Sequence, residues 1–219
     1  MKPILYLIIG KSGSGKNTLK DELVKLGVIP LHECTTRPAR PGEIDGKDYH
    51  FISEKEFHEG AYIGKLYIET AYGNWYFGIM KEKVEEDKTY GLIIGPKQYD
   101  EVITYYKNKA AIIPVWIDTD DEQRILNIIL REEHKKRPDY AEVCRRIKSD
   151  ATDFSEKKEL ILKIKEDSFL IYNQYDESLS DTAVELFYDR NYIAKYKSVN
   201  REESEDLKWK TIDIQRLLM

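Results

Sequence analysis

The sequence predicts an α/β fold, a doubly wound parallel sheet with a small β-rich insertion. Three observations support this fold class: apolar runs of strand length alternate with segments of helical spacing, a glycine-rich turn joins the first run to the first helix, and residues 33–80 change to short alternating runs rich in aromatics. At 219 residues the chain is one domain, or one domain with insertions, and it can bury about 70 per cent of its unfolded surface.

Five short apolar runs have the length and the bounding turns of buried strands. They are residues 4–9, 28–31, 90–94, 110–117 and 169–172. Gly95-Pro96 ends the third run. Pro114 interrupts the fourth, which predicts that this strand lies at a sheet edge or carries a bulge.

Segments with helical spacing separate these runs. We expect helices over residues 18–26, 79–87, 97–107, 119–133, from 138 onward, and 182–188. Thr119 with Glu122 forms a capping box for the fourth helix, and Pro138 suits the first turn of the fifth. On the fifth helix the residues expected to face the core are Tyr140, Val143, Cys144 and Ile147. Arg145 and Arg146 are then left toward the flanks or solvent.

Residues 33–80 have the pattern of small antiparallel strands, as in Tyr49-His50-Phe51-Ile52. Ser53 with Glu56 forms a capping box for a short helix that ends near Gly60. We interpret this region as an insertion into an α/β core. Residues 191–219 form a charged C-terminal extension, which either packs on the body or mediates self-association as a homodimer; packing is the favoured interpretation.

Composition excludes several functional classes. The formal charge of −5 leaves no overall basic footprint, so a nucleic-acid partner is not expected. Cys34 and Cys144 fit neither a disulfide framework nor a metal-ligand spacing, which indicates reduced thiols of a cytoplasmic protein. The first apolar run is too short for a signal peptide, and no stretch approaches ~18 apolar residues, so no membrane partner is expected.

The turn after the first apolar run reads Gly10-Lys11-Ser12-Gly13-Ser14-Gly15-Lys16-Asn17-Thr18. A buried strand, a glycine-rich turn and a helix are the context of a phosphate-binding loop, or P-loop. The glycines let several N–H groups point at one anion, and the helix start adds partial positive charge. Lys16 adds a full charge, worth about 4 kcal/mol at ~4 Å and an effective dielectric of ~20, before desolvation. The alternative is a glycine-rich β–α turn without a ligand.

We therefore predict an ATP site formed by Gly10, Ser12, Gly13, Ser14, Gly15, Lys16, Asn17 and Thr18. The pattern has Ser or Thr directly after the lysine to hold magnesium, but this chain has Asn17. An amide oxygen ligates Mg²⁺ more weakly than a polarised hydroxyl does, and Thr18 comes one position late. Asn17 and Thr18 are the expected magnesium ligands.

Two arginines lie among prolines in residues 35–51. Pro38 and Pro41 force Arg37 and Arg40 into extended backbone. Two guanidinium groups on a stiff loop suit a phosphate clamp, to which Tyr49 adds a neutral O–H donor. Alone, the segment would be a proline-stiffened surface loop; beside a P-loop, it predicts a second phosphate site.

Together the two motifs resemble the guanylate kinase family over about residues 4–190. The resemblance implies a P-loop core (1–32, 81–130 and 151–190), a monophosphate-binding region (33–80) and a mobile helical lid (131–150). It implies transfer of the ATP γ-phosphate to a nucleoside monophosphate, GMP or dGMP as the first guess, with Mg²⁺ as cofactor.

The resemblance also implies roles for residues. It places Arg37, Arg40 and Tyr49 on the acceptor phosphate and Glu69 on the guanine. The expected acceptor site comprises Cys34, Thr35, Arg37, Arg40, Glu43, Tyr49, Glu69, Tyr72, Asn74 and Phe77. The cations expected around the transferring group are Lys16, Arg37, Arg131, Arg137, Arg145 and Arg146. A charged run such as 131–137 is ordinarily a solvated helix junction, but phosphoryl transfer needs positive charge from outside the P-loop.

The sequence departs from the family pattern where the base is read. The family's Tyr-Gly-Thr/Ser element aligns with Tyr76-Phe77-Gly78-Ile79, so Phe77 replaces the tyrosine and Ile79 the hydroxyl; Tyr72 and Asn74 carry substitute polar groups. The family's Asp-Ile-Asp appears as Ile93-Ile94-Gly95, without either carboxylate. A lost base hydrogen bond removes ~1–3 kcal/mol of discrimination.

Two alternatives follow from these departures. One is a P-loop kinase with a relaxed or different acceptor, either another nucleoside monophosphate or another phosphorylated small molecule. The other is a guanylate kinase-like binding module that keeps the clamp to hold phosphorylated partners. The intact Gly13, Gly15 and Lys16 argue against the module, since a scaffold has no use for an ATP cradle.

Overall fold

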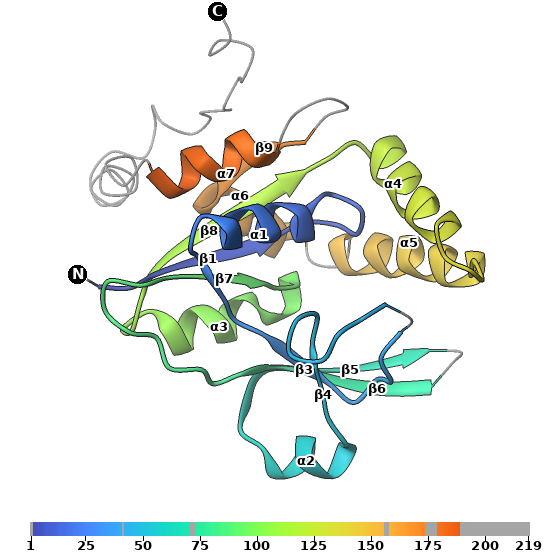
Figure 1. Cartoon of the computed structure of the whole chain (residues 1–219), viewed down its shortest axis with the longest axis horizontal. Helices are drawn as coiled ribbons and strands as arrows, with labels where there is room; N and C mark the ends of the chain where they lie inside the picture. Colours follow the sequence, from blue (N-terminus) through green and yellow to red (C-terminus); the bar gives the residue numbers. More distant parts are fainter. Residues whose placement is uncertain (1, 41, 71–72, 156–157, 174–178, 189–219) are drawn as a thin grey trace, which may run out of the picture.

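The computed structural model describes residues 2–40, 42–70, 73–155, 158–173 and 179–188. The C-terminal extension and Tyr72 lie outside the described residues. Two sheets form the frame of the described chain (Figure 1). None of the described helices is long and apolar enough to cross a membrane. Cys34 is buried, Cys144 is exposed and both are free thiols, as expected.

The larger sheet has the order β2-β7-β1-β8-β9, and every pairing in it is parallel. Its strands are β1 (Ile4–Ile9), β2 (Ile29–Pro30), β7 (Thr89–Ile93), β8 (Ala111–Asp118) and β9 (Phe169–Tyr172). All five predicted strands are therefore confirmed. Since β7 and β8 flank β1 on opposite sides, the turn after β1 lies at the point where the strand order reverses, where α/β sheets bind ligands.

Helices cover both faces of this sheet, which confirms the doubly wound fold (Figure 1). On one face lie α1 (Lys16–Lys25) and α7 (Leu179–Tyr188); on the other lie α3 (Tyr99–Tyr106) and α6 (Lys158–Asp167). Side chains of β1 alternate between the two cores. Leu5 and Leu7 pack with α3 and α6, whereas Tyr6 and Ile8 pack with α1 and α7.

The smaller sheet has the order β4-β3-β6-β5 and mixes parallel with antiparallel pairs. Its strands are β3 (Glu33–Thr35), β4 (His50–Phe51), β5 (Tyr62–Thr70) and β6 (Gly73–Met80). The predicted capping box of Ser53 and Glu56 is confirmed and opens α2 (Glu54–Glu59). Phe57 of α2 stacks on Tyr62 and Tyr76, with ring centroids 5.0 and 5.1 Å apart.

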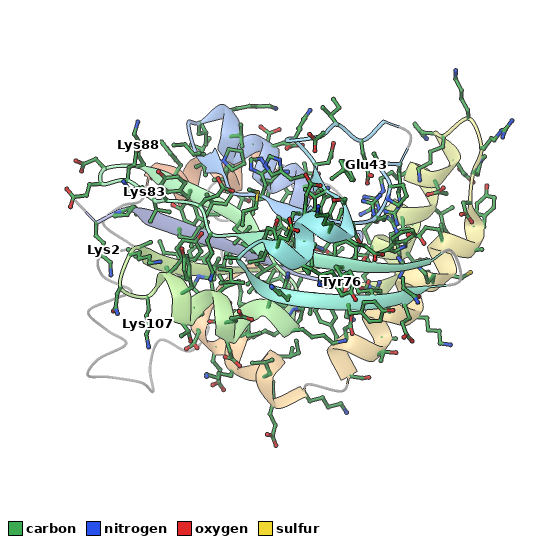
Figure 2. All side chains as sticks on the ribbon, turned by 90° about the horizontal axis from the view of Figure 1, so that it is seen from below. Lys2, Glu43, Tyr76, Lys83, Lys88 and Lys107 are labelled. Atoms are coloured by element: carbon green, nitrogen blue, oxygen red, sulfur yellow. The ribbon has the colours of Figure 1, made fainter. Side chains whose placement is uncertain are left out.

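The two faces of the smaller sheet have different surroundings. Cys34 pairs with Gly78, and its side chain lies on the face that α2 covers. Tyr76 lies on the same face, and Figure 2 views this face from the α2 side. Glu33 pairs with Ile79, a residue of the core beneath the larger sheet, and Thr35 pairs with Phe77. Because strand side chains alternate, Glu33, Thr35 and Phe77 face the body of the molecule.

Two helices, α4 (Asp121–Glu133) and α5 (Tyr140–Ser155), stand beside the sheets at the P-loop end (Figure 1). The capping box expected at Thr119 is wrong, because α4 begins after Asp120 and the Thr119 hydroxyl donates to the Ser14 carbonyl oxygen at 3.2 Å. Pro138 is not in the first turn of α5 either. Asp139 precedes that turn, and its carboxylate accepts the Glu142 N–H at 3.1 Å.

The core face predicted for α5 is wrong at two of its four residues. Val143 is buried and Ile147 is half-buried, but Tyr140 is 52% exposed and Cys144 is exposed. The helix instead buries two carboxylates, Glu142 and Asp150. Glu142 accepts hydrogen bonds from Arg40, Arg145 and Arg146, and Asp150 accepts one from Arg124. Polar contacts therefore replace the apolar packing that the spacing suggested.

Two further expectations fail for reasons of strand pairing. The helix expected over residues 79–87 is absent, because Ile79 pairs across the sheet with both Glu33 and Ile63 and the chain then runs irregularly to β7. Pro114 lies on an interior strand, between β1 and β9. Pairing between β8 and β9 starts only at Val115, so the side of Pro114 that faces β9 has no strand partner. The sheet therefore tolerates the missing backbone N–H of Pro114 there.

Replacing Ser53 by Ala should destabilise the protein by about 1 kcal/mol, because the Glu56 N–H loses its acceptor. Urea unfolding of wild type and variant measures the difference. Ser155→Ala is the matched control, since this exposed hydroxyl only donates to the Thr152 carbonyl oxygen near the end of α5. Equal effects of the two substitutions would contradict the assigned cap.

Candidate active site

The P-loop is closely packed against α4. Gly13 and Gly15 have φ angles of 81° and 99°, which favour glycine. A Cβ on Gly13 would overlap the Arg124 carbonyl oxygen, and one on Gly10 would lie 2.6 Å from the Ile117 carbonyl oxygen. The loop therefore needs glycine for its backbone conformation and for space.

Polar residues that follow the strands hold the loop in shape. The Thr119 hydroxyl and the Asn173 amide donate to the Ser14 carbonyl oxygen at 3.2 and 3.0 Å, and Asn127 of α4 donates to the Gly13 carbonyl oxygen at 3.0 Å. Thr119 and Asn173 come directly after β8 and β9. Their position at the carboxyl ends of parallel strands is the sequence signal by which they could have been found.

Lys16 lies at the start of α1 and donates from Nζ to the Lys11 carbonyl oxygen at 2.7 Å. Burial lowers the pKa of Lys16 to about 8, although the nearby Asp150 carboxylate favours the charged form. Arg131 and Arg124 lower this pKa further, so cations of α4 lie within electrostatic reach of Lys16.

Asp150 joins α5 to the P-loop. Its carboxylate accepts the Ser12 N–H at 2.9 Å, the Ser12 hydroxyl at 3.2 Å and Arg124 Nη1 at 3.2 Å. Arg124 also donates from Nε to Asp121 at 2.6 Å. Sequence reasoning missed both Asp150 and Arg124, because 26 residues separate them and no motif marks either.

Arg37 is held on the body side of the smaller sheet and is only 8% exposed. Its guanidinium forms a bidentate pair with Glu43 at 2.7 and 3.0 Å and lies 5.3 Å from the Tyr49 ring centroid. Glu43 also accepts the Arg40 N–H at 2.7 Å. Burial opposes ionisation of Glu43, but the hydrogen bonds from Arg37 and Arg40 outweigh it and keep the pKa of Glu43 below its ordinary value.

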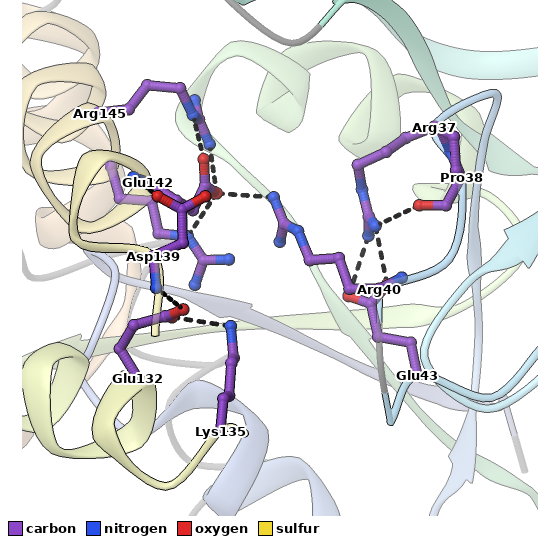
Figure 3. Close-up of polar contacts among 10 residues, drawn as sticks. Arg37, Pro38, Arg40, Glu43, Glu132, Lys135, Asp139, Glu142 and Arg145 are labelled. Carbon is purple, nitrogen blue, oxygen red and sulfur yellow. Dashed lines mark hydrogen bonds and ion pairs between the residues drawn. The ribbon is translucent and has the colours of Figure 1, made fainter. Parts of the chain in front are cut away.

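Glu142 connects Arg40 of the clamp loop with Arg145 and Arg146 of α5 (Figure 3). It accepts from Arg40 at 2.6 Å, from Arg145 at 2.7 and 2.9 Å, and from Arg146 at 2.8 Å. Burial by itself would raise the pKa of Glu142, yet these three arginines lower it to about 2. The spacing of Glu142 from Arg145 and Arg146 is a helical ion-pair signal that could have been read from the sequence.

The result is a row of cations from the P-loop to the clamp. Arg131 lowers the pKa of Lys16, and Arg146 lowers that of Arg131. Arg131 is exposed to solvent, and local desolvation together with the Arg146 charge lowers its pKa. Burial is the largest cause of the lowered pKa of Arg40, followed by the charges of Arg146 and Arg37. Lys16, Arg131, Arg146, Arg40 and Arg37 thus form a chain of neighbouring charges, here called the cation row. Such a row is suited to hold two polyanions side by side.

Other predicted site residues lie elsewhere. Arg137 is exposed and makes no hydrogen bond or ion pair within the described residues. Cys34 faces α2, where it donates to the Gly78 carbonyl oxygen, and burial raises its pKa to about 11. Glu69 pairs with Asn74, and alternation along the strands places both on the face opposite Phe77.

Thr35 and Phe77 do belong to the clamp face. Thr35 Oγ1 accepts the Arg37 N–H at 3.1 Å and donates to the Tyr76 carbonyl oxygen at 3.0 Å. The Phe77 and Tyr49 ring centroids lie 6.1 Å apart. The clamp face therefore comprises Arg37, Arg40, Tyr49, Thr35 and Phe77, with Glu43 holding the two arginines.

Asn17 and Thr18 lie exposed in the first turn of α1, and neither side chain makes a hydrogen bond within the described residues. Both offer neutral oxygens. The described residues contain no group of three or more His, Cys, Asp or Glu side chains that could hold a metal ion. Neutral oxygens of this kind can ligate Mg²⁺ beside phosphate oxygens and water.

Comparison with known proteins is consistent with this geometry. The guanylate kinase family model matches residues 2–169. A guanylate kinase of Lactobacillus acidophilus is 39% identical over 94 residues, which cover 40% of this chain and 46% of that protein. A guanylate kinase of Baumannia cicadellinicola is 29% identical over 214 residues, covering 90% of this chain and 97% of the relative. The matches to the first three curated relatives cover less than half of each relative.

The fold also matches a solved structure. The crystal structure of guanylate kinase from Anaplasma phagocytophilum superposes with a TM-score of 0.51 at 17% identity. The superposition covers 99% of this chain and 94% of that chain. This likeness supports the fold assignment.

Replacing Glu142 by Gln should remove a pH-dependent part of the stability. A carboxylate with a folded pKa of about 2 contributes stability above its unfolded pKa of 4.5 and loses it as the pH falls through the folded value. The shift corresponds to about 3 kcal/mol. Urea unfolding at pH 6, 4 and 3 should show the wild-type advantage over Glu142→Gln shrinking as the pH falls.

Glu122→Gln is the control for this experiment, because Glu122 is an exposed carboxylate on α4. A constant difference between wild type and Glu142→Gln at every pH would show that Glu142 does not hold the arginines through its charge.

Proposed function

The chain belongs to the guanylate kinase family, and on that premise we propose that it transfers the γ-phosphate of ATP to a nucleoside monophosphate, with GMP as the acceptor. The cation row carries this proposal. It runs from a P-loop lysine to a pair of clamped arginines, so one phosphate group can be held at each end.

Each part of the row has a role in the proposed reaction. Lys16 and the P-loop N–H groups hold the β- and γ-phosphates of ATP, and Arg37, Arg40 and Tyr49 hold the acceptor phosphate. An acceptor phosphate oxygen attacks the γ-phosphorus, a new P–O bond forms, and the bond to the β-phosphate oxygen breaks. Arg131 and Arg146 stabilise the charge that spreads between them, and one such arginine contributes ~10³–10⁵ in rate.

The carboxylates of the site bind these arginines but leave some of the arginine N–H groups without a protein partner. A guanidinium has five N–H groups. Among the described residues, Arg40 uses Nη2 on Glu142, and Arg146 uses Nε on the same carboxylate. The remaining N–H groups of both arginines are available to phosphate oxygens. Glu43, Glu142 and Asp150 therefore orient the arginines before the substrates bind, which reduces the entropy lost in binding.

Mg²⁺ would be held by the Asn17 amide oxygen, the Thr18 hydroxyl and the ATP phosphates, and it would neutralise charge on the β- and γ-phosphates. We also propose that α4, α5 and their connection act as the lid, since they carry Arg131, Arg145 and Arg146. The free thiols Cys34 and Cys144 support a reducing, cytoplasmic location.

Four lysines take no part in this proposal. Lys2, Lys83, Lys88 and Lys107 lie at the end of the molecule away from Glu43 and the clamp (Figure 2). They are therefore too distant to serve the proposed transfer.

Replacing Lys16 by Ala should abolish turnover while the fold persists, because the γ-phosphate loses its nearest full charge. A coupled assay with ATP, Mg²⁺ and each of GMP, AMP, CMP and UMP measures turnover, and circular dichroism checks the fold. Wild type should use GMP best. Failure of wild type to phosphorylate any of the four would sink the proposed kinase, and undiminished turnover by Lys16→Ala would refute the role of Lys16.

Replacing Arg40 by Ala should raise the KM for the acceptor at least tenfold, because a phosphate contact at the end of the cation row is lost. Arg137→Ala serves as the comparison, since the structure leaves Arg137 exposed and the family resemblance places it in the lid. If Arg137 contacts the γ-phosphate when the lid closes, Arg137→Ala should lower kcat and leave the acceptor KM unchanged. An unchanged acceptor KM in Arg40→Ala would rule out the clamp.

A further inference from the structure

Glu33 is a half-buried carboxyl on the clamp face that the phosphate contacts leave unused. Gln98 Nε2 donates to its Oε1 at 2.7 Å. Gln98 is 1% exposed and is fixed in turn, because its Oε1 accepts the Gly95 N–H at 2.8 Å and its Nε2 donates to the Gly64 carbonyl oxygen at 3.2 Å. The carboxyl group is therefore held by one oxygen, while Oε2 has no hydrogen-bond partner among the described residues.

A second polar group without a partner lies beside it. The Tyr49 hydroxyl makes no hydrogen bond within the described chain, and burial together with the Glu33 charge raises the Tyr49 pKa above its ordinary value. Arg37 lies over the Tyr49 ring, and Phe77 touches the ring from β6. Glu33 Oε2 and the Tyr49 hydroxyl, neither bonded to another described residue, thus share one face; in the proposed function the hydroxyl is used by the acceptor phosphate, whereas the carboxylate oxygen is left over.

The position of Glu33 compensates for carboxylates that β7 lacks. Ile93 and Gly95 stand at the end of β7, where the family resemblance expects acids. Gln98 connects this strand end to β3, because it bonds both the Gly95 N–H and the Glu33 carboxylate. The structure consequently has an acid at this place, but the acid comes from β3.

The energetics of Glu33 favour a ligand that donates N–H groups. A carboxylate with one neutral donor is poorly compensated when water is excluded. Burial raises the pKa of Glu33 to about 7, although the Gln98 hydrogen bond acts in the opposite direction. Two further N–H donors would compensate the charged form. The Watson–Crick edge of guanine presents two adjacent donors, N1–H and the N2 amino group.

We propose that Glu33 reads the acceptor base by accepting the N1–H and N2–H groups of guanine. This inference rests on the proposed function, since it assumes that the clamp holds a nucleoside monophosphate. It assigns base recognition to Glu33 in place of Glu69, which the β5–β6 register places on the opposite face of the sheet.

Calorimetric binding of GMP and of IMP, which lacks the N2 amino group, tests the assignment at pH 8 without ATP. Wild type should bind GMP more tightly than IMP. Glu33→Gln should weaken GMP binding by roughly 10- to 150-fold, because hydrogen bonds to a charged group are lost, and bring the GMP-to-IMP ratio toward one. Glu69→Gln should keep the ratio. Glu82→Gln is the matched control, since Glu82 is a half-buried carboxylate that accepts the His32 N–H outside the clamp face.

The pH dependence gives a second readout. Glu33 is charged above about pH 7. GMP affinity of wild type should therefore rise from pH 6 to pH 8 more steeply than that of Glu33→Gln, which supplies the baseline for titration of the nucleotide phosphate. The groups facing Glu33 are the neutral Gln98 and Tyr49, and burial raises the pKa of Tyr49, so it does not titrate in this range. Cys34 lies on the opposite face of the same strand, and burial raises its pKa to about 11.

Two results would overturn the assignment: an unchanged GMP-to-IMP ratio in Glu33→Gln, or loss of the ratio in Glu69→Gln alone. Should Glu33→Gln fail to fold, Glu33→Asp withdraws the carboxylate by one methylene and is expected to reduce the ratio in the same direction. Binding and turnover separate the two proposals. Selective GMP binding through Glu33 without turnover would refute only the kinase activity. Turnover of GMP together with an unchanged GMP-to-IMP binding ratio in Glu33→Gln would refute only the proposed recognition of the base by Glu33.

Discussion

Repulsion between like charges is the constraint on which the rest of this structure depends. The cation row brings five positive side chains within electrostatic reach of one another. Two unit charges ~6 Å apart repel by about 3 kcal/mol at an effective dielectric of ~20. Glu43, Glu142 and Asp150 offset that repulsion, since each is bonded to at least one arginine of the site. Anionic substrates would offset it further, so the same charges that strain the free protein favour binding.

The two sheets divide the work of positioning these charges. The larger sheet holds the P-loop at the carboxyl end of β1, and Thr119 and Asn173 reach it from the ends of β8 and β9. The smaller sheet holds Arg37, Tyr49 and Phe77 on its body side, while α2 covers the other face through Phe57. Helix α5 connects the halves, because Asp150 bonds the P-loop and Glu142 bonds the clamp.

Charge neutralisation and base recognition are separate problems at this site. Paired guanidiniums recognise any phosphate and carry no information about the base. Discrimination requires a polar group that is left unpaired by the wrong base. In the proposed scheme Glu33 is this group on the clamp face, since one of its oxygens is held by Gln98 and the other has no partner among the described residues. Because Glu33 is half-buried, its pKa is raised to about 7. In the proposed scheme the affinity for the acceptor base therefore depends on pH, since only the charged carboxylate accepts both N–H groups.

Local chemistry explains what could be read from the sequence alone. The strand runs, the P-loop glycines, the Ser53 capping box and the proline-stiffened Arg37 loop all depend on neighbours within a few residues, and the structure has each of them. The predictions that failed depend on distant partners. Ile79 pairs with Glu33 and Ile63 instead of entering a helix, and Thr119 bonds Ser14 across 105 residues instead of capping one. Likewise Glu142 meets Arg40 across 102 residues, a contact that helical spacing cannot report. Tertiary structure decided these pairings because a buried polar group takes whichever partner the packed chain brings within hydrogen-bond reach.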